Sequence, residues 1–349
     1  MRPLAYFDSS HDFPEEIAMA AGLTPVKILG DVKVDNAPAD QYLQNFLCPA
    51  ARSFLTDALA HAGSWEGIVV AHGCDITHRS FDIWKNHVKT PFIHWLNVPM
   101  VYDRPSAAAF FKKELKTLMK ALENQFKVSI TPENLKAAIK ESNEVKRRLQ
   151  QLSALRATKD IPNREYFDAC VKAVTMAKAD AIKTLDALLK DWSARAAFPA
   201  GMKKVFLTGS DVTYPEFMDT LEAANIRAVR DDLSIGERYY AALIPEKDDP
   251  LDALVAYKFA MPRPATKNPP DPRTDYILAV LKESGLDTVV SQNVKFCEPY
   301  LFDTVHIEKI LKSKGYKYIH LEREFSPVKD AQAINRLEAF IEMQGGAKA

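Results

Sequence analysis

The feature that most constrains the fold is a long stretch without glycine in the middle of the chain, from Ala107 to Arg195. Lysine, glutamate, leucine and alanine abound in it, and its apolar residues recur at spacings of three and four. In the first part of the stretch these residues are Phe110, Leu115, Leu118, Met119 and Leu122. Such spacing is typical of amphipathic helices. We therefore predict a helical module here, with a second helix that starts after Thr131 and with most charges on solvated faces.

Short apolar segments alternate with helix-length segments on both sides of this module. The first side carries expected strands at residues 3–7, 22–28, 65–71 and 92–96, with a helix at 14–21. The second side carries expected strands at 204–207, 226–229, 288–294 and 318–321, with helices at 215–224, 274–284, 302–314 and 330–343. Alternation of this kind favours parallel sheets with crossover helices.

These patterns predict an α/β protein with two Rossmann-like (flavodoxin-like) parallel-sheet domains and an intervening helical module. A chain of 349 residues exceeds the size at which a single core usually divides, so more than one domain is expected. We expect the domains at residues 1–105, 106–200 and 201–349. The two α/β parts are candidates for copies of one plan.

Charge and hydropathy exclude several classes of partner. Lys plus Arg and Asp plus Glu both number 46, so the balance gives no reason to expect binding to nucleic acid or to a membrane surface. No apolar run reaches the roughly 18 residues that a membrane span needs. The first residues contain acids and a proline where a signal peptide is apolar. A cytoplasmic protein is expected.

Four cysteines, none in a CxxC pair, are the candidates for chemistry. In a reducing compartment disulfides are not expected, which leaves packing, catalysis or metal binding. Cys74 and Cys297 follow the ends of expected strands, where open parallel sheets bind ligands. Cys48 lies ahead of Pro49 and a helix-forming run, where the positive end of a helix dipole favours a thiolate. Cys170 lies mid-helix and is expected to be inert packing.

The spacing of the cysteines leaves their role open. The short spacings of local zinc and iron–sulfur motifs are missing, so a scaffold with three packed cysteines stays an alternative. A thiol nucleophile at Cys74, with His72 or His78 as its base, is another. His94 is expected to be a core histidine.

Two other chemistries have little support in the sequence. The segment 208–210, TGS, lacks the glycine pattern of a phosphate loop and is expected to be a tight strand-to-helix turn. No GxSxG motif is present, so acyl transfer by a serine has no support.

Several stretches of the sequence, taken together, resemble those of a known family. The most specific is VKFCEPYLFD around Cys297 with the later YIHLEREFSPVKDAQAINRLEAFIEM; others are GCDITHR with IWK, FFKKELKTLMKALE with ITPENLKAAI, LTGS with YPE, and DDLSIGERYY. These segments resemble the 2-hydroxyacyl-CoA dehydratase and benzoyl-CoA reductase family over nearly the whole chain, more loosely around Cys48. The chain departs from many members at Ser234 and at Met261–Pro264, where they carry cysteines.

The resemblance implies a [4Fe–4S] cluster at the interface of the two α/β domains, held by Cys48, Cys74 and Cys297. Cys170 matches no ligand position. Three thiolates for four irons leave one iron able to take water or a substrate oxygen. Asp75 and Glu298, adjacent to ligands, are candidate acid–base groups or helix caps, and capping is preferred. Backbone amides after Gly73 and the Lys295 side chain are candidates for tuning the cluster.

The resemblance also implies a reaction and partners. A separate ATP-hydrolysing iron–sulfur activator supplies one low-potential electron, and a 2-hydroxyacyl-CoA loses water through a ketyl radical to give an enoyl-CoA. The alternatives are a benzoyl-CoA reductase-type subunit that reduces an aromatic ring, and a cluster-carrying subunit that only relays electrons or supports its partner. A related second subunit, giving a heterodimer or larger complex, and an acyl-CoA substrate are expected.

Overall fold

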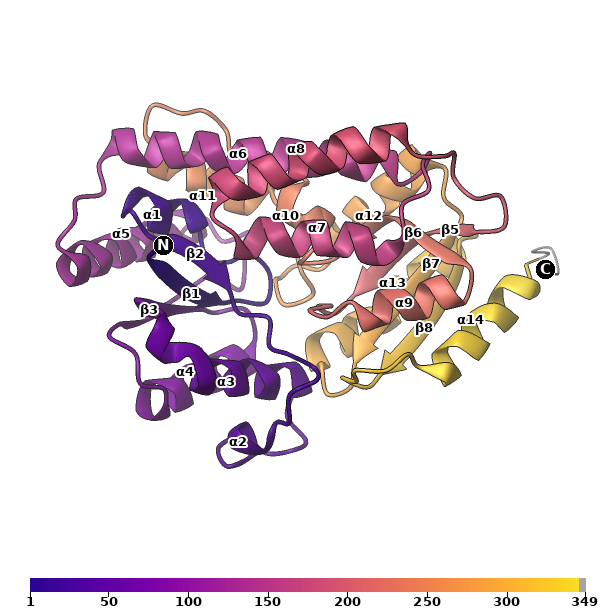
Figure 1. Cartoon of the computed structure of the whole chain (residues 1–349), viewed down its shortest axis with the longest axis horizontal. Coiled ribbons are helices and arrows are strands. Elements are labelled where there is room, and N and C mark those ends of the chain that lie inside the picture. Colours follow the sequence, from indigo (N-terminus) through magenta and orange to yellow (C-terminus); the bar gives the residue numbers. More distant parts are fainter. Residues whose placement is uncertain (345–349) are drawn as a thin grey trace.

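The chain is an α/β protein with two four-stranded, all-parallel sheets and a helical segment between them, as the sequence predicts. The structure is a computed structural model that describes residues 1–344 (Figure 1). The limits of the three expected domains stay a prediction.

The first sheet is formed by β1 (Pro3–Phe7), β2 (Thr24–Lys27), β3 (Gly67–Ala71) and β4 (Ile93–Leu96), in the order β2-β1-β3-β4. The connecting helices are α1 (Glu15–Ala20), the short α2 (Ala37–Asp40), α3 (Pro49–His61) and α4 (Asp75–His87), with a 3-10 turn at Ala62–Ser64. All five residues of β3 are buried, as expected for a strand covered by helices on both faces.

The second sheet repeats this plan. Its strands are β5 (Lys203–Gly209), β6 (Ile226–Asp232), β7 (Thr288–Val294) and β8 (Lys317–Arg323), in the order β6-β5-β7-β8. In chain order within each half, both sheets therefore read 2-1-3-4. Its helices are α9 (Glu216–Ala223), α10 (Glu237–Tyr240), α11 (Pro250–Ala260), α12 (Asp271–Ser284), α13 (Glu298–Ser313) and α14 (Ala331–Glu342).

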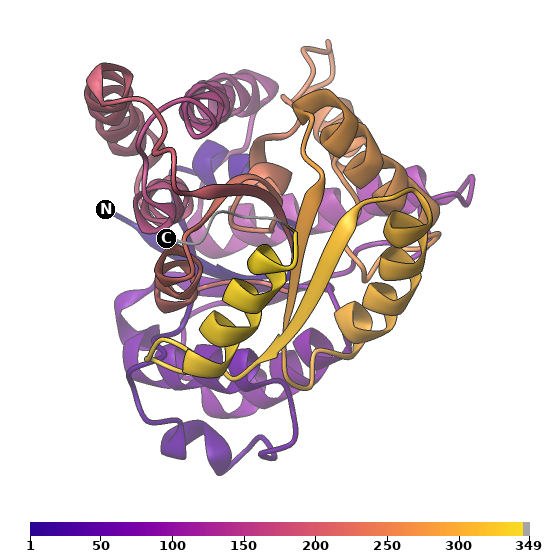
Figure 2. The same ribbon diagram turned by 90° about the vertical axis from the view of Figure 1, so that its right-hand side faces the viewer.

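Alternate residues of the second sheet face two separate hydrophobic clusters, as the two-residue period of a strand requires. Phe206 and Val289 pack with α12 and α13, whereas Leu207 and Val290 pack with the cluster that contains α9 and α14. Figure 2 shows α14 on one side of this sheet and α12 and α13 on the other.

The helical segment consists of α5 (Ala107–Phe126), α6 (Pro132–Leu155), α7 (Asn163–Thr175) and α8 (Lys178–Ala194). Thr131 caps α6, as predicted, because its hydroxyl accepts the N–H of Asn134 at 3.2 Å. The apolar residues of α6 pack against both halves of the chain. Leu135 joins the cluster of the first sheet and Leu149 joins that of the second, and α6 and α8 lie along both halves in Figure 1.

Some element limits differ from the sequence prediction. The helix expected from residue 302 begins at Glu298, and the one expected from 274 begins at Asp271. Each has a proline in its first turn, where the missing N–H has no intrahelical partner to lose. The helices α2, α10 and α11 were not predicted. Among them α11 packs into the cluster of the first sheet and α5, through Leu251 and Leu254.

Candidate functional site

The three cysteines expected to act together occupy equivalent local positions. Cys48, Cys74 and Cys297 are each the residue directly ahead of a helix, namely α3, α4 and α13. Each is only partly exposed. Backbone amides of the following turn favour the thiolate at each one, from Ala51 for Cys48, Thr77 for Cys74 and Tyr300 for Cys297. A helix N-terminus offers such unpaired N–H groups to an anion.

The three thiols also act on one another. Burial raises the pKa of each thiol above its usual value, and that of Cys74 to about 12. The charge of Cys48 raises the pKa of Cys74 further, and the charges of Cys48 and Cys74 both raise that of Cys297. Since such charge effects weaken with distance, the three sulfurs lie near one another. We call the region that holds them the thiol crevice.

A strained turn positions Cys297 in this crevice. The N–H of Cys297 donates to the carbonyl of Val294 at 3.2 Å, which closes a turn at the end of β7. Phe296 within this turn has a φ of 63°, in the left-handed region where a bulky residue is rare. Its side chain is 50% exposed, so burial in the core does not explain the phenylalanine. Strained residues of this kind concentrate at functional sites.

Loops at equivalent positions of the two halves carry the cysteines and the residues near them. Cys74 follows β3 and Cys297 follows β7, the third strand of each half. The loops after the first strands, β1 and β5, both lead into a helix through an aromatic-Pro-Glu sequence, Phe13–Glu15 and Tyr214–Glu216. The loop after β1 therefore matches the loop after β5, and the loop after β3 matches the loop after β7.

Three aspartates that the sequence prediction missed lie in those first-strand loops; Asp8 and Asp12 are buried and Asp211 is partly exposed. Asp8 forms an ion pair with Lys27, and Asp12 lies 2.7 Å from Nζ of Lys258. Oδ1 of Asp211 and both carboxylate oxygens of Asp12 are buried without a hydrogen-bond partner within residues 1–344. Burial raises the pKa of Asp211 to about 6.

Comparison with known proteins identifies the family. The family model described as "2-hydroxyglutaryl-CoA dehydratase, D-component" matches residues 11–344, which include every element described above from α1 onward. The chain belongs to the 2-hydroxyglutaryl-CoA dehydratase D-component family.

Individual relatives of this D-component chain are distant but match over nearly the full length. The (R)-phenyllactyl-CoA dehydratase beta subunit of Clostridium sporogenes is 26% identical over 94% of this chain and 88% of the relative. A benzoyl-CoA reductase subunit of Thauera aromatica is 22% identical over 91% and 86%. The beta subunit of (R)-2-hydroxyglutaryl-CoA dehydratase from Acidaminococcus fermentans is 22% identical over 94% and 89%.

The sequence suggested helix capping by Asp75 and Glu298, and this was wrong in position. In this D-component chain the cysteines hold the N-cap positions, and the two acids are the first residues of α4 and α13. There they favour the helices through the dipole. The Asp75 side chain is 79% exposed and lies 3.5 Å from Arg79. An acid–base role for either residue stays a prediction.

Other expected neighbours of the cysteines have partners of their own. The N–H groups of Gly73 and Cys74 donate to Oγ1 of Thr77 at 3.1 and 3.2 Å, whereas those of Ile76 and Thr77 act on the Cys74 thiol. Lys295 forms an exposed ion pair with Glu324. Gly73 has no room for a side chain, because a Cβ there would lie 1.9 Å from Oγ of Ser9.

The histidines near Cys74 pack as aromatic rings. His72 and His78 lie with their ring centroids 5.3 and 5.0 Å from that of Trp95. The Cys74 side chain instead takes part in a capping box with Thr77, which leaves a thiol–histidine pair without support. His94, expected in the core, is partly exposed and stacks on Phe92.

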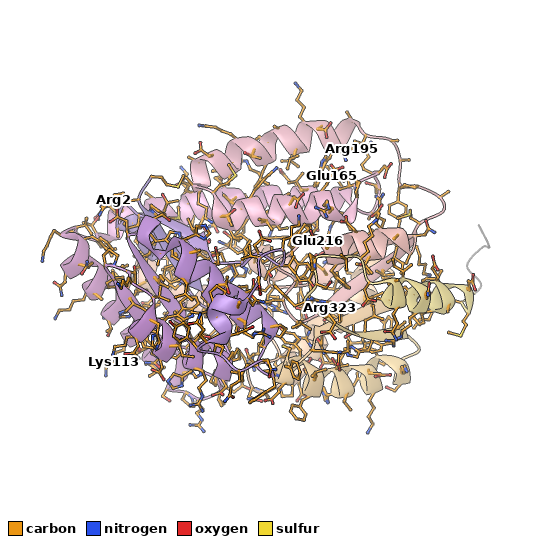
Figure 3. All side chains as sticks on the ribbon, turned by 60° about the horizontal axis from the view of Figure 1, so that its bottom comes forward. Arg2, Lys113, Glu165, Arg195, Glu216 and Arg323 are labelled. Carbon is orange, nitrogen blue, oxygen red and sulfur yellow. The ribbon has the colours of Figure 1, made fainter. Side chains whose placement is uncertain are left out.

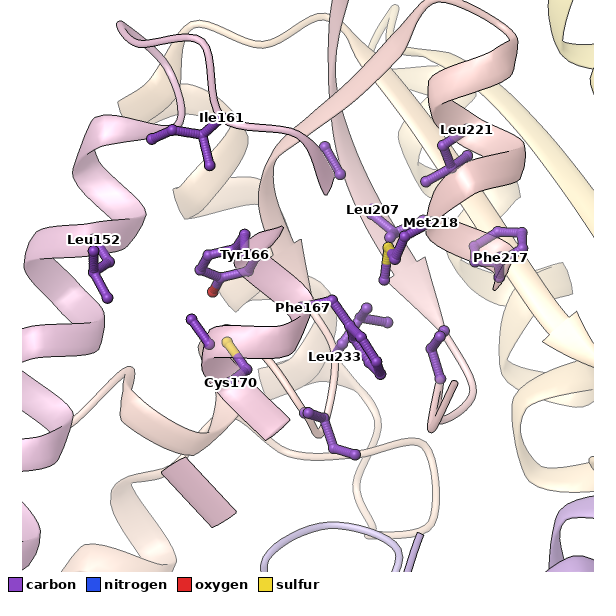
Figure 4. Close-up of a cluster of buried hydrophobic side chains, with 14 of the residues drawn as sticks. Leu152, Ile161, Tyr166, Phe167, Cys170, Leu207, Phe217, Met218, Leu221 and Leu233 are labelled. Carbon is purple, nitrogen blue, oxygen red and sulfur yellow. The ribbon is translucent and has the colours of Figure 1, made fainter. Parts of the chain in front are cut away.

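Cys170 is packing material, as predicted. It is 2% exposed in the middle of α7, in a cluster with Phe167 and Leu207 (Figure 4).

The TGS segment was expected to be a tight strand-to-helix turn, and this was wrong: Thr208 and Gly209 end β5, and a loop from Ser210 leads to α9 at Glu216. The N–H of Ser210 donates to the carbonyl of Gln292 at 3.0 Å.

Two further observations delimit the site. Within residues 1–344 no three His, Cys, Asp or Glu side chains come close enough together to share a single metal ion. A four-iron cluster is a different case, because each thiolate binds its own iron. The described part of the chain also contains no helix of the length and apolar character needed to cross a membrane.

A cavity of about 850 Å³ lies elsewhere, between α6 and the segment before α11. No cysteine lines it. Its wall includes Lys136, Lys140 and Arg147 from α6.

Proposed function

We propose that this chain is one subunit of an oxygen-sensitive enzyme that holds a [4Fe–4S] cluster through Cys48, Cys74 and Cys297. The enzyme acts on a CoA thioester, and its reaction is the loss of water from a 2-hydroxyacyl-CoA to give an enoyl-CoA. The proposal is supported by the position of the three thiols at three helix N-termini, with the charges of Cys48 and Cys74 acting on Cys297.

The chemistry of the donor set fits such a cluster. Three buried thiolates repel one another and are costly without a cation, which is why burial and mutual charge raise their pKa values. Iron ions supply the missing positive charge, so binding releases protons from the thiols. When bound, the cluster supplies a low-potential electron and one iron with a free coordination position.

Residues of the chain would hold the cluster and shield it from water. Helix amides orient the sulfurs, and the hydrophobic cluster of Phe7, Phe54 and Trp84 packs beneath Cys48, which contacts it. The rings of Phe7 and Trp84 stack with centroids 5.5 Å apart. This packing excludes water from one side of the crevice, and a dry surrounding strengthens each electrostatic contact within it.

Partners are part of the proposal. Two of the relatives are named as beta subunits, and the benzoyl-CoA reductase relative is likewise named as one subunit of its enzyme. We propose a related second subunit in a heterodimer or larger complex, and an ATP-hydrolysing iron–sulfur activator as the electron donor. The proposal of an activator is supported by the resemblance of the sequence to the family described above.

Iron content after substitution tests the ligand set. Cys297→Ser protein, purified without oxygen, should lose the brown absorbance and most of its iron, because serine is a poor ligand for a cluster. Cys170→Ala, which removes a buried thiol outside the crevice, should keep the iron of the parent. Full iron content in the Cys297→Ser protein would contradict the assignment.

Anaerobic turnover of the complex tests the reaction. With its partner and activator, the protein should remove water from a 2-hydroxyacyl-CoA. Reduction of benzoyl-CoA instead would support the activity named for one relative. Unchanged turnover after loss of iron from the Cys297→Ser protein would indicate a supporting role for this chain.

A further inference from the structure

Lys267 is a buried cation without a carboxylate of its own. The buried lysines within residues 1–344 are Lys27, Lys146, Lys178, Lys258 and Lys267. Each of the first four forms an ion pair with a different acid, namely Asp8, Glu16, Glu15 and Asp12. Lys267 instead lies 3.6 Å from Asp12, the same residue that pairs with Lys258 at 2.7 Å. One carboxylate therefore serves two ammonium groups, and one positive charge is in excess.

The ammonium group of Lys267 contacts the loop that carries Cys74. Its Nζ donates to the carbonyl of His72 at 3.0 Å and lies 3.4 Å from the sulfur of Met100. The Lys267 side chain is 0% exposed, so the chain itself supplies these contacts. His72 precedes Cys74 by two residues, and two residues of chain span at most about 7 Å. A hydrogen bond and a short piece of chain therefore place the charge of Lys267 beside Cys74.

Backbone hydrogen bonds fix the segment that carries Lys267, which lies between α11 and α12. The N–H of Lys267 donates to the carbonyl of Pro264 at 3.1 Å. The N–H of Asn268 donates to the carbonyl of Met100 at 2.8 Å, and the carbonyl of Asn268 accepts the N–H of Tyr102 at 3.0 Å. The segment is thus joined to the chain that follows β4. The buried position of Lys267 is therefore set by the backbone around it.

Asp12 belongs to a second loop that packs against the loop of Cys74. It follows β1, and a Cβ on Gly73 would lie 1.9 Å from Oγ of Ser9 in this loop. The Asp12 side chain is 0% exposed, and neither of its carboxylate oxygens has a hydrogen-bond partner within residues 1–344. Its neighbours are the charges of the two lysines. We call Lys258, Asp12 and Lys267 the buried triad.

The excess positive charge of the buried triad calls for an anion nearby, because an uncompensated buried charge destabilises a folded chain. Within residues 1–344 no other carboxylate forms an ion pair with Lys258 or Lys267. A cluster held by the Cys74 thiolate is such an anion, and its negative charge grows when it accepts an electron. A buried cation beside it favours the state with more negative charge, since little water screens the attraction.

We propose that Lys267 is a positioning residue for the cluster, which fixes the loop of Cys74 through the His72 carbonyl and favours the reduced state through its charge. This inference rests on the proposed function and deepens it, because it names a residue that sets the reduction potential of the site. Lys267 acts through the loop and through its electric field, without binding iron.

Reduction potentials of the parent and three variants, each purified without oxygen and with its cluster, test this role. Lys267→Met keeps the apolar stem of the side chain and removes its charge. Asp12→Asn removes the shared carboxylate and leaves both lysines. The control, Lys113→Met, removes an exposed charge on α5 (Figure 3). The potentials are read from redox titrations followed by EPR, and iron content is measured on the same samples.

We expect the four proteins to hold the same iron. In Lys267→Met the equilibrium between the two states should move about tenfold toward the oxidised state, which lowers the potential by about 59 mV for one electron. In Asp12→Asn the potential should rise, because two lysine charges then act without the aspartate. In Lys113→Met it should stay at the parent value, because water and salt screen an exposed charge. A merely structural role would not produce shifts of opposite sign.

An unchanged potential in Lys267→Met would overturn the inference, and so would shifts of the same sign in Lys267→Met and Asp12→Asn. If one of these two variants loses its iron, the other decides alone by the direction of its shift. Loss of iron from both would make the buried triad structural and overturn the inference as well. A parent protein that holds no cluster would instead refute the proposed function, and the inference with it.

Discussion

Replacing Gly209 with alanine should break the junction between β5 and β7. Gly209 has a φ of 131°, which residues with a side chain rarely adopt. A Cβ at this position would lie 1.7 Å from the carbonyl oxygen of Gln292 and 2.7 Å from its carbonyl carbon. These are backbone atoms of the neighbouring strand, so no side-chain rotation can relieve the overlap.

The expected loss of stability follows from the backbone strain at residue 209 and from the hydrogen bonds that must break. The unfavourable φ costs about 1–3 kcal/mol for a non-glycine residue. To admit the Cβ, Gln292 must shift away from Ser210, with which it shares two hydrogen bonds, one of 3.0 Å and one of 2.6 Å. Each contributes about 1 kcal/mol net. The free energy of unfolding should therefore fall by about 4 kcal/mol, a large part of the roughly 5–15 kcal/mol typical of a folded protein.

Urea unfolding, followed by circular dichroism, measures this change. The matched control is Gly201→Ala, because a Cβ there would meet no atom within 4 Å. The control should stay within about 0.5 kcal/mol of the parent. A Gly209→Ala protein that unfolds within about 1 kcal/mol of the parent would refute the reasoning, since it would mean that the two strand ends can separate at little cost.

Two further substitutions test buried polar groups elsewhere in the chain, His11 and Asn143. Burial holds the pKa of His11 well below its usual value, so His11 takes up a proton only on unfolding, and the free energy of unfolding should fall as the pH drops below about 6.5. In His11→Asn, which suits the left-handed φ of 51°, this fall should weaken by up to about 1.4 kcal/mol per pH unit, as measured by thermal melts from pH 7 to 5. Asn143 exchanges two hydrogen bonds of 2.9 Å with the backbone of Ile244, so Asn143→Ala should lower the free energy of unfolding by about 2–4 kcal/mol in urea titrations. The exposed Asn86→Ala should change it by less than about 0.5 kcal/mol.

Several strands of the fold were predictable from apolar runs, as in the GIVVA of β3, whose five residues are all buried. Residues 288–294 were expected as a strand and form β7 with the same limits, all seven of them buried. The helix α11 was missed for the same physical reason. Residues Leu251, Ala253, Leu254 and Val255 are all buried, so Pro250–Ala260 has no polar face whose period would reveal a helix.

The site was predictable only in part. Cys74 and Cys297 stand out in the sequence because they directly follow apolar strands. Asp211 has no such signal, since an aspartate after Thr-Gly-Ser is an ordinary turn residue. The pairing of Lys27 with Asp8 and of Lys258 with Asp12 also joins elements far apart in the sequence, so the sequence does not reveal it. The one available clue was the aromatic-Pro-Glu sequence that ends both loops.

The two halves differ in the loop that follows the second strand. In the first half Cys48 lies directly ahead of α3, the second helix after β2, and Cys74 lies directly ahead of α4, which follows β3. In the second half Cys297 lies directly ahead of α13, which follows β7, but the residue directly ahead of α10, the first helix after β6, is Gly236. Ser234, two residues earlier, is fully buried, and its carbonyl bonds to His11 of the first half. The loop after the second strand therefore carries a cysteine in the first half and a buried polar contact with that half in the second.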